Sequence, residues 1–232
     1  MAEMPTLNGP TLAPLSGGNP QQLVILLHGV GSDGDDLIGL APYFQKILPD
    51  ALFVSPHAPY AFDMAPQGHQ WFSLQDMTPE ARLAGTQTAA PILDAFIDEQ
   101  LAAAGLGDDK LALVGFSQGT MMALHVGLRR ANPVAGILGY SGMLVGPELL
   151  ADAIQSRPPV LLAHGDADDV VPVSALSDAV AGLTAVGVSV THHTSPGLGH
   201  GLDDDGVSKG MEFLAGVFGV DLAAMAAAQP PG

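Results

Sequence analysis

Five short segments of the chain are apolar at every position instead of alternating between apolar and polar residues. Continuous apolarity is typical of strands buried on both faces, as in a parallel sheet that helices cover on each side. A sixth segment, residues 188–193, mixes polar and apolar positions and is predicted to be an edge strand. The five apolar segments are residues 23–27, 51–54, 111–114, 134–138 and 160–163.

The segments between these strands space their apolar residues as helices do, three or four positions apart. The three sets are Leu37, Leu40, Phe44 and Ile47; Ile92, Phe96 and Leu101; and Met121, Leu124, His125 and Leu128. Pro91 lies within the second helical segment and is expected to kink or restart it, and Gly105 to end it. Alternation of strands and helices predicts an α/β fold, an open and mostly parallel twisted sheet with right-handed crossovers.

The length of 232 residues is compatible with a single domain. Residues 1–20 are rich in Pro, Gly and Asn, and residues 221–232 are rich in Ala and end in Pro-Pro-Gly. We therefore expect one domain over residues 1–232, with a core at about 21–217 and an arm at each end.

Composition excludes several classes of partner and mechanism. Seven Lys and Arg against 24 Asp and Glu give a formal charge of −17, which repels nucleic acid and anionic membrane surfaces. The absence of Cys removes disulfides, thiolate metal sites and cysteine nucleophiles. The first twenty residues lack a basic and an apolar signal region, and no apolar run approaches a membrane span. We expect a soluble, cytoplasmic protein with no nucleic-acid partner and no stable membrane anchor.

The strongest chemical signal is the glycine-flanked serine of Gly115-Phe116-Ser117-Gln118-Gly119, between an apolar strand and a helical segment. A serine at such a strand-to-helix turn is held clear of the sheet, with the following N–H groups at a helix N-terminus. The pattern alone also fits an ordinary glycine-rich loop. Its position at the carboxyl end of a strand favours a nucleophile.

A serine hydroxyl needs a base, which is usually a histidine oriented by a carboxylate. His200 follows the last strand in the flexible segment Gly197-Leu198-Gly199-His200-Gly201, whereas His125, His192 and His193 fall on predicted helix or strand positions and are interpreted as structural. The carboxylate is expected in the segment after the 160–163 strand. The spacing leaves Asp166, Asp168 and Asp169 open as candidates.

Acyl transfer also needs donors for the developing oxyanion. The turn Leu27-His28-Gly29-Val30-Gly31-Ser32-Asp33-Gly34 exposes backbone N–H groups after the first apolar strand. It lacks both glycine-rich phosphate-binding patterns, so a nucleotide loop is disfavoured. The N–H groups of Val30 and Gln118 are the predicted oxyanion donors.

Taken together, these segments resemble the phospholipase/carboxylesterase family of α/β-hydrolases, which includes the acyl-protein thioesterases. The matching motifs occur in family order over about residues 21–217: LLHGVGSDG (26–34), PHAP (56–59), QWFSL (70–74), GFSQGT (115–120), YSG (140–142), HGDADDVVP (164–172) and GLGHG (197–201). The resemblance implies Ser117 as nucleophile, His200 as base and Asp168 as its partner. The sequence departs from the family pattern at Thr120, where glycine is commoner, and at Leu198, where methionine is usual. Neither position carries a reacting atom.

The resemblance also places the acyl groove along residues 60–78. Trp71, Phe72 and Met143 are therefore predicted to contact substrate, with Met64 and Met77 as an adaptable apolar wall. Composition alone favours a core position for Trp71, the only tryptophan.

These observations predict a serine carboxylesterase that hydrolyses short- to medium-chain esters or thioesters through an acyl-enzyme, without cofactor or metal. No long insertion that could form a cap domain lies between residues 140 and 160, so we expect an open site. Two alternatives stay open: a metal-dependent hydrolase using His164, Asp166, Asp168 and His200, and a catalytically silent binding protein on the same fold. A homodimer is also left open.

Overall fold

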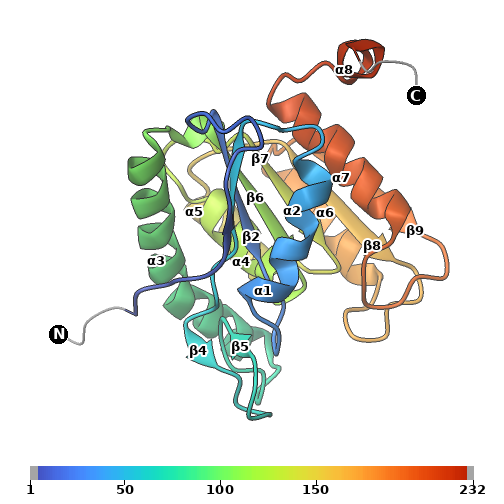
Figure 1. The fold of residues 1–232 in the computed structure, drawn as a ribbon. Helices are drawn as coiled ribbons and strands as arrows, with labels where there is room; N and C mark the ends of the chain where they lie inside the picture. The colour runs from blue at the N-terminus through green and yellow to red at the C-terminus, as the bar shows by residue number, and fades with distance from the viewer. Residues whose placement is uncertain (1–4, 229–232) are drawn as a thin grey trace.

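The computed structural model describes residues 5–228 and contains one large sheet of seven strands (Figure 1). Their order across the sheet is β1-β3-β2-β6-β7-β8-β9, and all neighbours are parallel except β1 and β3. The strands are β1 (Thr11–Leu12), β2 (Gln22–Leu27), β3 (Ala51–Val54), β6 (Leu111–Phe116), β7 (Gly136–Tyr140), β8 (Val160–Gly165) and β9 (Val190–Ser195). The predicted parallel sheet is confirmed, with β9 at one edge.

Helices cover both faces of this sheet (Figure 1). One face packs against α1 (Gly34–Leu37), α2 (Ala41–Phe44) and α7 (Asp204–Val217). The other packs against α3 (Pro79–Ala104), α4 (Gln118–Gly127), α5 (Leu150–Ala153) and α6 (Ser174–Ala185). The remaining elements are the short 3-10 helices η1 (Ile38–Leu40), η2 (Asp108–Lys110) and η3 (Pro147–Leu149), the helix α8 (Leu222–Ala228), and a hairpin of β4 (Tyr60–Ala61) and β5 (His69–Gln70).

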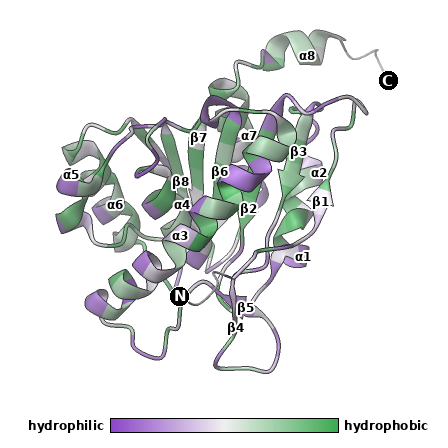
Figure 2. Cartoon of the chain, turned by 90° about the vertical axis from the view of Figure 1, so that its left-hand side faces the viewer, coloured by the Kyte–Doolittle hydropathy of each residue, from purple (hydrophilic) through white to green (hydrophobic). Residues whose placement is uncertain are grey.

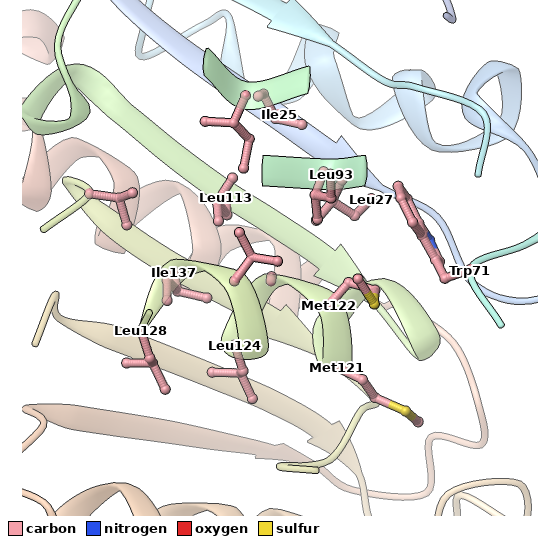
Figure 3. Close-up of a cluster of buried hydrophobic side chains, with 14 of the residues drawn as sticks. Ile25, Leu27, Trp71, Leu93, Leu113, Met121, Met122, Leu124, Leu128 and Ile137 are labelled. Atoms are coloured by element: carbon pink, nitrogen blue, oxygen red, sulfur yellow. The ribbon is translucent and has the colours of Figure 1, made fainter. Parts of the chain in front are cut away.

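The central strands are hydrophobic along their length and lie between the two helix layers (Figure 2). Figure 3 shows the larger core, where Leu113 of β6 and Ile137 of β7 face Met122 and Leu124 of α4. Burial of apolar surface on both faces is the main contribution that stabilises the packing of such a sheet against its helices. The Ser117 segment between β6 and α4 is therefore attached to a fully buried part of the molecule.

The helix α3 runs without interruption from Pro79 to Ala104, so the predicted restart at Pro91 is wrong. Pro91 lies on the exposed side of α3, as does Gln87, whose carbonyl would otherwise accept the missing N–H. Water can satisfy that carbonyl, while Ile92 and Leu93 stay buried on the inner side. The packed face thus keeps the helix continuous despite the proline.

The prediction that residues 1–20 form only an arm is wrong for the part that the structure describes. Residues 1–4 lie outside the described part, but Leu7 is buried and β1 adds an antiparallel edge strand beside β3. At the other end, α8 projects beyond α7 in Figure 1, and residues 229–232 lie outside the described part.

The connection between β7 and β8 holds only η3 and α5, so no cap domain covers the carboxyl edge of the sheet there. Within residues 5–228, none of the helices has both the length and the apolar character needed to cross a bilayer.

Candidate active site

Ser117 occupies the turn between β6 and α4, with φ 53° and ψ −115°. This strained conformation is held from both sides by close packing. A Cβ on Gly115 would lie 2.4 Å from the Thr120 nitrogen, and one on Gly119 would lie 1.8 Å from the Leu27 carbonyl oxygen. Both glycines of the sequence pattern are therefore required by backbone contacts, and the turn presents Ser117 at the edge of the sheet.

Three predicted residues meet at this turn. The Ser117 hydroxyl lies 3.0 Å from His200 Nε2, and His200 Nδ1 donates to Asp168 Oδ2 at 2.8 Å. Asp168 follows β8 and His200 follows β9, so the carboxyl ends of three strands bring the side chains together. The His200 ring also lies against Phe116, with 5.0 Å between ring centroids. This is the arrangement of a hydroxyl nucleophile, a base and an orienting carboxylate.

The Asp168 carboxylate is buried and fully hydrogen-bonded. Its Oδ1 accepts from Val170 N–H at 2.9 Å and from Val171 N–H at 2.8 Å. Burial raises the pKa of Asp168, but the hydrogen bonds from His200, Val171 and Val170 outweigh burial and leave that pKa below its ordinary value. Asp168 is therefore an anion beside His200 at neutral pH.

His164 supports the same carboxylate. It is buried, its Nε2 donates to the Val171 carbonyl at 2.8 Å, and this nitrogen lies 3.3 Å from Asp168 Oδ2. From the sequence, His164 was suggested only as a metal ligand. Its contacts with Asp168 and Val171 could not be predicted, because they depend on how the loop after β8 folds back.

The two neighbouring acids face elsewhere. Asp169 is exposed, and Asp166 is exposed and accepts from Gly197 N–H at 2.6 Å. Asp166 thus holds the loop that carries His200. The other three residues of the alternative metal site lie together at Asp168, but in the described part of the chain they do not have metal-ligand spacing.

Among the described residues, one group of three side chains has metal-ligand spacing: Asp33, Asp35 and His57. His57 Nδ1 accepts from Gly34 N–H at 3.1 Å, so the hydrogen of the neutral ring is on Nε2, the nitrogen that faces Asp35. A metal would need the lone pair of that nitrogen, so this tautomer does not suit a metal ligand.

The turn after β2 lies against Ser117, because a Cβ on Gly29, the residue before Val30, would lie 3.2 Å from the Ser117 Cβ. In the described part of the chain, the N–H groups of Val30 and Gln118 donate to no other protein group. Gln118 is the first residue of α4, whose N-terminus carries partial positive charge. Two unpaired donors next to a serine hydroxyl can stabilise an oxyanion.

His28 joins this turn to the segment after β3. Its Nε2 accepts from Ala58 N–H at 2.9 Å, and its Nδ1 donates to the Gly29 carbonyl at 2.7 Å. Burial lowers the pKa of His28 to about 4, so the ring is neutral and can accept the Ala58 hydrogen bond. Sequence reasoning missed this role, although His28 directly precedes the glycine turn.

The β4–β5 hairpin holds the turn from its outer side. Gly31 N–H donates to the His69 carbonyl at 2.8 Å, and His69 N–H donates to the Ser32 carbonyl at 2.7 Å. The Phe62 ring also packs against Gly31. The 60–78 segment therefore contacts the predicted oxyanion turn directly.

The predicted groove residues differ in exposure. Trp71 has no exposed surface and Phe72 is 3% exposed, so neither offers area to a substrate in this structure. Met64 and Met77 are exposed. Met143 is partly buried and lines a cavity of about 440 Å³ between α3, η3 and α6. The wall of this cavity adjoins the turn that carries Ser117, because Gly142, next to Met143, packs against the Ser117 backbone carbonyl.

Residues 15–217 match the sequence profile of the family described as Phospholipase/Carboxylesterase. The chain belongs to the phospholipase/carboxylesterase family. It is an enzyme of the serine hydrolase class, and its sheet is that of an α/β-hydrolase.

Individual relatives support this assignment. Esterase YpfH of Escherichia coli (strain K12) is 28% identical over 194 residues, which cover 84% of this chain and 82% of that protein. Acyl-protein thioesterase 1 of Gibberella zeae is 26% identical, over 76% of this chain and 82% of its own length. The crystal structure of esterase PE8 is 46% identical, has a TM-score of 0.88, and covers 91% of this chain and 99% of that chain.

Proposed function

We propose that this family member is a serine carboxylesterase that hydrolyses short- to medium-chain carboxylic esters or thioesters. The observation that carries the proposal is the hydrogen-bonded series Ser117–His200–Asp168, with the free N–H groups of Val30 and Gln118 on the two segments that meet at Ser117. Relatives named esterases and acyl-protein thioesterases support the choice of an acyl substrate.

In this mechanism Ser117 Oγ attacks the acyl carbonyl carbon while His200 Nε2 takes the hydroxyl proton. The Val30 and Gln118 N–H groups donate to the tetrahedral oxyanion, and the Asp168 anion stabilises the His200 imidazolium. His200 then protonates the departing alcohol or thiol, which leaves Ser117 acylated. Water, deprotonated by His200, releases the carboxylic acid and restores Ser117.

The cavity beside Met143 supports a limit on acyl length. Small-molecule sites range over roughly 300–1,000 Å³, and a volume of about 440 Å³ lies near the lower end. Its wall includes Met143, Leu144 and Val145 from the segment after β7. We propose that this cavity takes the acyl chain and that Met143, but neither Trp71 nor Phe72, contacts it.

The test compares the wild-type enzyme with Ser117→Ala on p-nitrophenyl esters of increasing chain length. We expect Ser117→Ala to lower kcat by about 10⁴-fold or more with an unchanged fold, because only oxyanion and binding effects survive. A fluorophosphonate probe should form one adduct, on the peptide that holds Ser117. An adduct on another serine, or a wild-type enzyme that neither reacts nor hydrolyses esters, would overturn the proposal. Loss of wild-type activity in EDTA would instead favour a metal-dependent hydrolase.

A further inference from the structure

Trp71 connects the two segments that supply the proposed oxyanion donors. Its backbone N–H donates to Gln118 Oε1 at 2.8 Å, and its indole N–H donates to the His28 carbonyl at 3.0 Å. Gln118 carries one proposed donor on its own backbone, and His28 lies two residues before Val30, which carries the other. One residue, through its backbone N–H and its indole N–H, thus touches both halves of the proposed oxyanion site.

These contacts are enclosed by protein. Trp71 and His28 have no exposed surface, and Gln118 is 1% exposed. The Gln118 side chain forms a second hydrogen bond, from Nε2 to the Phe72 carbonyl at 2.8 Å. A buried side chain fixed at two points cannot shift without leaving polar groups unpaired, so the spacing between the segments is rigid.

The chemistry requires this rigidity. Both N–H groups must lie about 2.7–3.1 Å from one oxygen that carries charge only in the transition state. Val30 follows β2, Gln118 begins α4, and no hydrogen bond between these two residues is present in the described structure. Pairing of β2 with β6 and the close approach of Gly119 to Leu27 fix the bases of the two segments. Beyond these contacts, the relative position of the two N–H groups depends on what bridges the segments. Figure 3 shows Trp71 beside Leu27, the residue from which the turn begins.

We propose that Trp71 is a positioning residue that sets the spacing between the Val30 and Gln118 N–H groups. The proposal rests on the proposed esterase function and concerns the same site. It assigns Trp71 to transition-state stabilisation, acting through His28 and Gln118, in place of the substrate contact predicted from the sequence.

The first experiment measures kcat and KM for Trp71→Phe. This variant keeps an aromatic ring and the backbone N–H to Gln118 but loses the indole N–H to His28. We expect kcat to fall about 10- to 100-fold, since one displaced donor costs less than the ~10²–10³ of a deleted one. KM should stay within about threefold of the wild-type value. The inhibition constant of an alkyl boronic acid should rise by the same factor by which kcat/KM falls.

Tyr140→Phe is the matched control. It removes one buried aromatic donor, the Tyr140 hydroxyl that bonds to the Gly206 carbonyl at 3.3 Å on the opposite face of the sheet. We expect its kcat, KM and boronic acid inhibition to match those of the wild type. A Trp71→Phe enzyme with raised KM and unchanged kcat would overturn the proposal and favour the substrate contact predicted from the sequence. Equal kinetics in the two variants would also overturn the proposal.

A second experiment needs no substitution and decides the case if Trp71→Phe does not fold. Because Trp71 is the only tryptophan, 5-fluorotryptophan labelling gives a single ¹⁹F resonance. We expect this resonance to shift with the boronic acid, whose tetrahedral adduct places an oxygen between the donors, and to stay in place with the alcohol of equal chain length. Equal shifts with both ligands, or none with either, would overturn the proposal. A wild-type enzyme without activity or fluorophosphonate labelling would overturn the proposed function, and this inference with it.

Discussion

Asp168 and Asp169 are adjacent acids whose carboxylates have different surroundings. Asp168 accepts hydrogen bonds from His200 and two backbone N–H groups, while Asp169 is exposed. We expect Asp168→Asn to lower kcat by about 10⁴-fold, because an amide favours the wrong tautomer of His200. Asp169→Asn removes the same charge one residue away and should cost far less. Steady-state kinetics of both variants checks this, and a larger loss at Asp169 would show that the wrong acid was assigned.

His125 offers a test of how buried imidazoles respond to pH. It is 5% exposed, its Nδ1 has no hydrogen-bond partner in the described structure, and burial, aided by Arg129, lowers the pKa of His125 to about 4. The unfolded chain binds the proton near pH 6.5, so acid favours unfolding between about pH 6.5 and 4. The loss in free energy of unfolding reaches about 3 kcal/mol below pH 4.

We therefore expect His125→Leu to reduce the loss of stability on acidification from pH 7 to pH 4. At pH 7 its free energy of unfolding should equal or exceed that of the wild type, because an unpartnered polar atom is removed. Urea unfolding at several pH values measures both effects. His28→Leu is the comparison: burial also lowers the pKa of His28 to about 4, so its loss should reduce the acid dependence too, but it breaks two hydrogen bonds and should lower the free energy of unfolding at pH 7. A pH dependence identical to that of the wild type would contradict the assignment.

At the scale of elements, the strands that could be predicted are those buried on both faces. Continuous apolar runs indicated β2, β3, β6, β7 and β8, although β7 begins two residues later than expected and extends to Tyr140. The two-residue strand β1 and the β4–β5 hairpin could not be predicted, because they lie among prolines and glycines. Both also depend on distant contacts: β1 pairs with β3, and His69 of the hairpin bonds to the turn after β2. Local pattern carries no information on such contacts.

The candidate site divides in the same way. Ser117 and His200 could be singled out because their glycine motifs follow strands, and the structure brings them to Asp168. Their catalytic roles stay predictions. The links from Gln118 to Trp71 and from Trp71 to His28 could not be predicted, because they join residues more than 40 positions apart. The sequence favoured a buried position for Trp71, but it did not indicate that the indole N–H would donate to the His28 carbonyl.

The β4–β5 hairpin yields a prediction through Gly68. This residue has φ +86°, and a Cβ there would lie 2.2 Å from the Gly31 carbonyl oxygen. We expect Gly68→Ala to push the hairpin away from the turn that carries Val30, and so to lower kcat about tenfold or more with a smaller change in KM. Kinetics and thermal unfolding measure the two effects separately.

Gly105→Ala is the control for backbone strain. Gly105 has φ +67°, but nothing lies within 4 Å of its Cβ position at the end of α3. Its replacement should cost about 1–2 kcal/mol of stability and leave kcat and KM unchanged. If Gly68→Ala behaved in the same way, the hairpin would have no effect on the oxyanion turn.

At the scale of the whole molecule, negative charge dominates, because 24 Asp and Glu outnumber seven Lys and Arg. Arg130 is held by Asp94, Asp98 and Asp108, so it offers little charge to a ligand. Arg82 lines the cavity proposed for the acyl chain, but Glu148 and Asp178 line it too. The local balance at this cavity therefore has the same sign as the net charge of −17.

This charge distribution predicts how salt affects substrate choice. An anionic thioester approaches through a repulsive field, whereas an uncharged p-nitrophenyl ester of equal chain length feels no long-range force. Added salt shortens the field from about 30 Å at 0.01 M to less than 10 Å above 0.1 M. We expect kcat/KM for the anionic substrate to rise between 10 mM and 500 mM NaCl, and kcat/KM for the neutral ester to change little. Arg82→Gln should steepen the rise, because it removes a cation that lines the cavity, and Glu148→Gln should flatten it. An anionic substrate that is better at low salt, and loses its advantage in Arg82→Gln, would instead show that Arg82 outweighs both carboxylates and forms a local site for anions.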